Sequence, residues 1–119
     1  MPKQIILDLE KDPELLNTTA KEWAEAINRT KKTQVRNFYD RVLELKEDIK
    51  RDGFDNTYPF IMMLNSKVAY GVSRKVVSSE FQDMMNQCLE EIKRRKNEEA
   101  FDTFQLFFEA VLGFFKGRD

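Results

Sequence analysis

Three clusters of lysine and arginine occur in the sequence, and cations grouped in this way can bind phosphate. The first opens the stretch TKKTQVRNFYDRVLEL, residues 30–45, with Lys31, Lys32 and Arg36. These residues lie at the start of a predicted helix, where cations oppose the helix macrodipole and free backbone N–H groups attract anions. The arrangement favours a bound phosphate, and a solvated helix face is the alternative explanation.

The second cluster lies in LNSKVAYGVSRK, residues 64–75, where Lys67 and Arg74 are seven residues apart on one stripe of a predicted helix. Their stems can pack against the protein while their charged heads reach water. The Arg74 fork also suits bidentate phosphate binding, and Lys75 adds charge beside it. Gly71 costs about 1 kcal/mol relative to alanine inside a helix, which predicts the close approach of a neighbouring helix or a bound strand.

The third cluster, KRRK at residues 93–96, closes a predicted helix. Cations suit that position because they complement the negative end of the macrodipole. We therefore predict a structural role for this run rather than a specific binding role.

Residue types that support catalysis are scarce. The sequence has no histidine and a single cysteine, Cys88, so a histidine base, a thiolate zinc site and a disulfide framework are not expected. Asp52 and Asp55 flank a turn at Gly53 and are only a weak signal for a cation, while the adjacent carboxylates of residues 90–91 and 98–99 are typical of a solvated helix surface. We expect no enzymatic activity, no cofactor and no metal.

Composition limits the class of protein further. The chain has 119 residues, is 34% charged and carries a formal net charge of −1, so a nucleic-acid contact must come from a local patch. No apolar run approaches the length of a membrane span, and no segment reads as a secretion signal.

The elements that would position these cations are predicted to be helices. A first helix is expected from Asp12-Pro13 towards Arg29, with Trp23, Ala26 and Ile27 clustered on it. A second helix is expected to start at Thr33 as its cap and to end at Gly53. Its apolar seam recurs at alternating steps of three and four residues: Val35, Phe38, Val42, Leu45 and Ile49. On its other side lie Lys32, Arg36, Lys50 and Arg51, with Tyr39 and Leu43 between them.

Three more helices follow in the predicted order. Asn56-Thr57 with Pro59 is expected to start a helix from Phe60 to about Val72, and its nearly uniform apolarity favours a central, enclosed position. Ser79 and Gln82 form a predicted capping box for the fourth helix. Its predicted apolar face is Phe81, Met84, Met85, Cys88 and Ile92.

Asn97 is expected to open the last helix and Gly117 to stop it. Its predicted core face is Ala100, Phe101, Phe104, Phe107, Phe108, Val111, Leu112 and Phe115. Residues 1–12 are expected to form an arm or a packed extension. The prediction is an all-α fold: residues 1–119 form one domain, a single compact bundle of about five helices.

Three blocks carry a resemblance to a known family: the stretch at residues 30–45, the stretch at residues 64–75, and AFDTFQLFFEAVLGFFK at residues 100–116. Together they resemble the small, all-helical subunit of type III-A CRISPR interference complexes, the second of the Csm proteins. They match its Thr-led amphipathic helix, its Lys-x-x-Tyr-x-x-x-Arg helix and its aromatic terminal helix. The resemblance covers roughly Lys31 to Lys116.

The resemblance implies a non-catalytic scaffold of a prokaryotic, cytoplasmic ribonucleoprotein that acts in antiviral and anti-plasmid defence. Such subunits stack into a minor filament beside the backbone and large subunits and contact the backbone of guide RNA paired to target RNA. The basic positions of the family correspond to Lys32, Arg36, Lys67, Arg74 and Lys116, and the residue analysis adds Lys75. The competing hypothesis is a protein-only helical adaptor whose cations are merely solvated.

Overall fold

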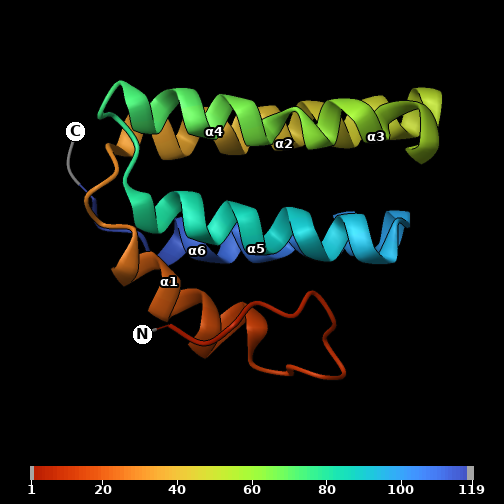
Figure 1. The fold of residues 1–119 in the computed structure, drawn as a ribbon. Coiled ribbons are helices and arrows are strands. Elements are labelled where there is room, and N and C mark those ends of the chain that lie inside the picture. The colour runs from red at the N-terminus through yellow and green to blue at the C-terminus, as the bar shows by residue number, and fades with distance from the viewer. Residues whose placement is uncertain (1, 118–119) are drawn as a thin grey trace.

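The computed structural model describes residues 2–117, and within that range it contains helices and no strand. A π-helical turn, η1, is followed by six α-helices, and the all-α prediction is confirmed (Figure 1). The elements are η1 (Leu15–Thr19), α1 (Ala20–Ala26), α2 (Lys32–Asp52), α3 (Phe54–Met62), α4 (Leu64–Ser73), α5 (Ser79–Arg95) and α6 (Glu98–Phe114).

The helices form layers. The helices α2, α3 and α4 make one layer, α5 and α6 make the next, and α1 lies against α6 on the far side (Figure 1). Only Met63 separates α3 from α4, and the two follow each other as one rod. Counted this way, the bundle has the five helical rods expected from the sequence.

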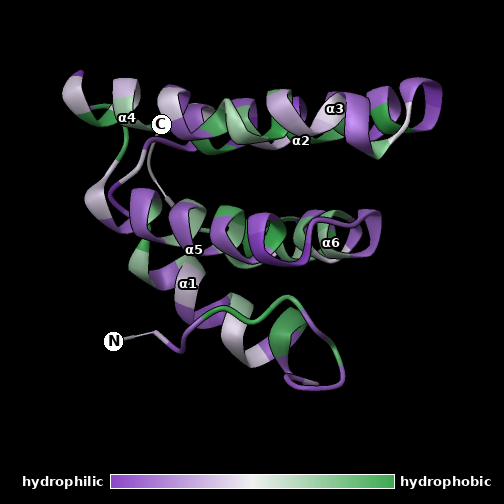
Figure 2. Ribbon diagram, turned by 45° about the vertical axis from the view of Figure 1, so that its right-hand side comes forward, coloured by the Kyte–Doolittle hydropathy of each residue, from purple (hydrophilic) through white to green (hydrophobic). Residues whose placement is uncertain are grey.

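The core is built from the predicted seams. All five seam residues of α2 are buried, and so are the five predicted residues of α5. Hydrophilic and hydrophobic residues alternate along α5 (Figure 2), as expected for a helix with one buried face. Burying each large apolar side chain contributes roughly 1.5–3 kcal/mol, so these seams fix how the layers pack.

The aromatic face of α6 is also core. Phe108 is fully buried, and its ring centroid lies 5.5 Å from Tyr39, 6.2 Å from Phe81 and 6.1 Å from Phe104. Of the eight predicted face residues only Leu112 is partly exposed. These rings therefore link α2, α5 and α6 and are not available to stack on bases.

Residues 3–7 pack as an extended arm along α5. The Ile5 and Leu7 side chains are buried. Their backbone N–H groups donate to the side chains of Gln87 and Glu91, both at 2.9 Å, and Arg95 donates to the Leu7 carbonyl. Side chains of a helix thus replace the neighbouring strand that an extended segment would otherwise require.

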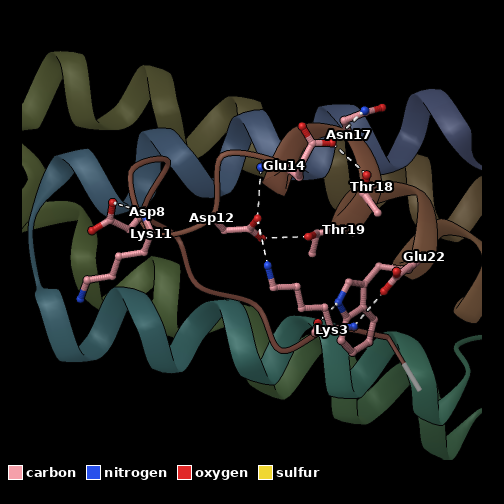
Figure 3. Close-up of polar contacts among 10 residues, drawn as sticks. Lys3, Asp8, Lys11, Asp12, Glu14, Asn17, Thr18, Thr19 and Glu22 are labelled. Atoms are coloured by element: carbon pink, nitrogen blue, oxygen red, sulfur yellow. Dashed lines mark hydrogen bonds and ion pairs between the residues drawn. The ribbon is translucent and has the colours of Figure 1, made fainter.

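A buried carboxylate anchors the end of this arm. Asp12 is 1% exposed and accepts hydrogen bonds from the Thr19 hydroxyl at 2.8 Å and the Glu14 backbone N–H at 3.1 Å (Figure 3). The Lys3 amine lies 3.2 Å from it, and Trp23 donates to the Lys3 carbonyl at 2.8 Å. Asp12 therefore joins the arm to η1 and α1.

Several predicted boundaries are wrong. The first helix ends at Ala26 rather than near Arg29, because Ile27 leaves the helical conformation at φ −91° and ψ 13°. The chain turns there, and Thr30 becomes buried. Part of the expected helix, Leu15–Thr19, is a π-helical turn.

The helix caps differ from those expected. The α2 helix begins at Lys32 with Lys31 as its cap, no side chain caps it, and Thr33 lies inside its first turn. The α5 cap is Ser78, one residue before the predicted capping box, and its hydroxyl accepts from the Phe81 N–H at 3.1 Å. The prediction for α6 is correct at Asn97, whereas the helix ends at Phe114, before Gly117.

The third predicted helix starts earlier than expected and is not enclosed. Gly53 ends α2 at φ +90°, as predicted, and α3 begins directly after it, so Pro59 lies inside a helix. Phe60, Met63 and Tyr70 are 49%, 45% and 63% exposed. The α3–α4 rod lies on the outside of the bundle and buries only the face turned towards α2 and α5.

Candidate nucleic-acid interface

Two stretches of the chain carry cations and no carboxylates. Residues 27–39 contain four cations and no aspartate or glutamate, and residues 56–79 contain three cations and none of either acid. The whole chain has a net charge of −1, so its acidic residues are concentrated elsewhere. The cations of the two stretches are Arg29, Lys31, Lys32, Arg36, Lys67, Arg74 and Lys75.

The start of α2 presents bare backbone donors beside cations. No side chain caps this end and no acidic residue lies in the first turn. Lys31, Lys32 and Arg36 are exposed, and none of them forms an ion pair with any residue in the range 2–117. Uncapped N–H groups and the positive end of the macrodipole favour an anion at this place.

The end of α4 presents a second group of cations. The Arg74 guanidinium lies over the Tyr70 ring, 5.5 Å from the centroid, and the next residue, Lys75, turns the chain with a positive φ of 62°. The turn explains Gly71, since a Cβ there would lie 2.7 Å from the Val77 side chain. The predicted close approach is therefore real, but it comes from the chain's own turn rather than from another helix or a bound strand.

Hydroxyl groups hold these two ends together. The Thr30 hydroxyl accepts from the Ser78 N–H at 2.9 Å, and the two hydroxyl oxygens lie 2.8 Å apart. Thr30 directly precedes Lys31 and Lys32, while Ser78 follows the turn that carries Lys75. The cations of both segments are thereby fixed at one end of the bundle.

Lys116 lies at the same end, since α6 finishes beside the start of α2 and the end of α4 (Figure 1). It borders a concavity shared with Lys21 and Asn28 of the α1 side and with Phe114 of α6. We call the group formed by this convergence the cationic end. Its members are Arg29, Lys31, Lys32, Arg36, Arg74, Lys75 and Lys116.

Lys67 lies apart from Arg36. A groove between α2 and α4 is lined by Gln34, Arg41 and Lys67 among others. Arg36 comes two residues after Gln34, about 200° further around the helix, so it points away from this groove. Arg36 and Lys67 therefore do not share one face of the bundle. Arg41 lines the groove together with Lys67 instead. Its position in the middle of α2 carries no sequence signal for binding, and only the packing of α2 beside α4 brings it to the groove.

Three of the four cations that close α5 are engaged in the fold. Arg94 pairs with Glu91 at 2.8 Å, and Arg95 binds the arm and lies 3.7 Å from Glu99. The Lys96 amine lies over the Tyr58 ring, 5.0 Å from its centroid. These contacts agree with the structural role predicted for residues 93–96 at Arg94, Arg95 and Lys96, while Lys93 is exposed. Glu91, expected only to solubilise, is itself part of the arm's attachment.

The cysteine and the aspartate considered for catalysis or metal binding are held in structural surroundings. Burial raises the pKa of the Cys88 thiol, which keeps it protonated. Asp52 accepts from Arg51 at 3.0 Å. In the described range of residues 2–117, no three or more histidine, cysteine, aspartate or glutamate side chains are grouped to hold a metal ion. Every helix in that range is also too short or too polar to cross a lipid bilayer.

Fold and surface together define a small helical bundle whose cationic end gathers seven lysine and arginine residues, none of which forms an ion pair within residues 2–117. The chain belongs to the Csm2 Type III-A family, whose model matches residues 10–118. Membership makes it a small subunit of a type III-A CRISPR complex, together with other Csm subunits. Members of this family are structural subunits of the complex. Comparison with curated proteins gives no match, and comparison with solved structures gives none either.

Proposed function

We propose that this subunit is non-catalytic and binds the backbone of guide RNA paired to target RNA in the complex. The contacts are made by Lys32, Arg36, Lys67, Arg74, Lys75 and Lys116. They serve antiviral and anti-plasmid defence in the prokaryotic cytoplasm. Phosphate contacts position a protein on nucleic acid without reading sequence, which suits a subunit that must accept any guide.

The observation that carries this proposal is the convergence of unpaired cations. Lys50, Arg51 and Arg94 each lie within 3.2 Å of a carboxylate. By contrast, the cations of the cationic end have no carboxylate partner within residues 2–117. Cations that repel one another at one end of a fold become stabilised when phosphates neutralise them.

Copies of the subunit lie side by side in this proposal, next to the backbone and large subunits. Phe60 and Met63 support it, since they form an exposed apolar pair on the outer rod, 49% and 45% exposed. The same pair favours the alternative, a protein-only adaptor that uses the apolar surface and leaves its cations solvated.

Copurification with a tagged backbone subunit distinguishes the two functions. We expect the protein to be retained with both the subunits and RNA, and the charge reversal Arg36→Glu with Arg74→Glu to reduce the RNA protected in the complex. Lys50→Glu with Lys93→Glu is the matched control and should leave protection unchanged. Full RNA protection by the cationic-end variant would establish the adaptor function. Cleavage of RNA by the purified protein with a divalent ion would contradict the non-catalytic assignment.

A further inference from the structure

The groove between α2 and α4 has the size and chemistry of a small-ligand site. Its volume is about 440 Å³, within the ~300–1,000 Å³ typical of such sites. It opens on the outer layer beside the cationic end. Its lining residues are Gln34, Asn37, Phe38, Arg41, Ser66, Lys67 and Tyr70.

The α2 wall of the groove carries amide groups that the fold leaves free. Neither the Gln34 nor the Asn37 side chain forms a hydrogen bond with any residue from 2 to 117. Each amide offers both a donor and an acceptor. Opposite them, the Ser66 hydroxyl donates to the Met63 carbonyl at 3.0 Å and keeps its lone pairs as acceptors. The walls therefore present a mixed set of donors and acceptors.

The α4 wall adds an exposed ring. Tyr70 is 63% exposed, and the Arg74 guanidinium lies over it at 5.5 Å from the centroid. Lys67 borders the same groove without an ion pair in the described range, while Arg41 has only a long contact of 3.8 Å with Glu44. Exposed rings, amides and cations together are the means by which proteins hold unpaired RNA bases.

We propose that this groove binds one unpaired, unstacked nucleobase of RNA, and this inference rests on the proposed backbone binding at the cationic end. The base stacks on Tyr70 and its edge bonds to Asn37 and Gln34, while Lys67 lies near the adjoining phosphate. A paired base cannot enter, since its face and its Watson–Crick edge are already occupied. An apolar side chain from a neighbouring subunit would leave the two amides without partners.

Fluorescence anisotropy at low salt with the full-length chain tests the base site. The probes are a labelled single-stranded RNA and a fully abasic strand of the same length and charge. We expect the wild type to bind the abasic strand about 5- to 150-fold more weakly, the range that stacking one base provides. Tyr70→Ala should bring the two affinities together, and Tyr70→Phe should preserve the difference. Leu106→Ala, which truncates an exposed apolar side chain on α6 outside the groove, is the control and should behave as wild type.

The outcomes separate the two proposals. Equal wild-type affinity for the two strands would overturn the base site and leave the backbone proposal standing. A difference that survives Tyr70→Ala would also overturn it, because the base would then bind elsewhere. Failure to bind either strand would overturn the backbone proposal and this inference together.

Discussion

The hydroxyl oxygens of Thr30 and Ser78 lie 2.8 Å apart, although 48 residues separate them in the sequence. The Thr30 hydroxyl also accepts from the Ser78 N–H, and the Ser78 hydroxyl accepts from the Phe81 N–H. One short network therefore caps α5 and fixes the start of α2 against the turn after α4. Thr30 is 1% exposed, so water cannot replace these bonds.

Thr30→Val removes the hydroxyl and keeps the shape of the side chain. It leaves the Ser78 N–H without an acceptor at a part-buried place, and we expect a loss of about 1–3 kcal/mol in the free energy of unfolding. Urea denaturation measures this loss. Thr33→Val, at an exposed position in the first turn of α2, should change stability by at most about 0.5 kcal/mol. Equal effects of the two substitutions would contradict the role given to the network.

The Asp12 carboxylate is held by hydrogen bonds more than by its ion pair. Lys3 is 54% exposed, so the pair is screened by water and Lys3→Ala should cost less than about 1 kcal/mol. Asp12→Ala removes the acceptor of the Thr19 hydroxyl and the Glu14 N–H and should cost about 1–3 kcal/mol. Urea denaturation of both variants measures the two losses in the free energy of unfolding. A larger loss for Lys3→Ala than for Asp12→Ala would contradict the dominance of the hydrogen bonds.

Phe108→Ala should lower the free energy of unfolding by about 3–5 kcal/mol, because it empties the centre of the aromatic cluster. Thermal or urea unfolding followed by circular dichroism measures the change. Leu106→Ala, on the same helix at 41% exposure, is the comparison and should cost far less. A loss below about 1 kcal/mol at Phe108 would mean that the rings are not packed as described.

Salt dependence reports the backbone contacts of the assembled complex. Arg36→Ala or Arg74→Ala should weaken binding of every RNA sequence and lower the slope of log affinity against log salt by about 0.7–0.9 per contact. Arg36→Lys keeps the charge, so the salt slope should remain unchanged. Affinity should fall only by the contribution of the bidentate hydrogen bonds that lysine cannot form. Lys50→Ala, whose lysine pairs with Glu47 at 3.2 Å, is the control. Unchanged slopes for both arginine variants would show that these two residues are solvated and do not contact RNA phosphates.

The Asp8 carboxyl, at the end of the arm, makes the stability of the fold depend on pH. Backbone hydrogen bonds from Glu10 and then Lys11 lower the pKa of the Asp8 carboxyl below its usual 3.8. A pKa depressed in the folded state stabilises the fold above the unfolded pKa, and that stabilisation disappears as pH falls through the folded pKa. Wild type should therefore be more stable than Asp8→Ala at neutral pH, and the difference should shrink well below pH 3.8. Urea titrations at both pH values measure it, and a difference that grows on acidification would refute the sign.

The buried faces of the helices could be predicted from the periodicity of the sequence. Helix boundaries that depend on contacts between residues distant in the sequence could not. The α2 seam from Val35 to Ile49 repeats over four turns, so its buried face followed directly. The end of α1 did not follow, because the chain turns where Thr30 meets a residue 48 positions away. Pro59 suggested a helix start by its local preference, yet α3 continues through it.

The candidate surface shows the same division. The cations of the cationic end were visible as types and spacings, and their convergence required knowing that α2, α4 and α6 have ends in common. The groove could not be predicted, since Gln34 and Asn37 are ordinary helix-surface residues until Tyr70 lies opposite them. The apolar sequence from Phe60 to about Val72 predicted a central, enclosed helix. This prediction was wrong, because an outer rod can also carry exposed apolar side chains.

The attachment of the arm to α5 has a consequence for how the protein is made. Ile5 and Leu7 bond to Gln87 and Glu91, which the ribosome adds more than 80 residues later. During synthesis these two apolar side chains have no helix to pack against until α5 has left the ribosome. Closing so long a loop is entropically slow, so the arm, although translated well before α5, is among the last segments to find its place.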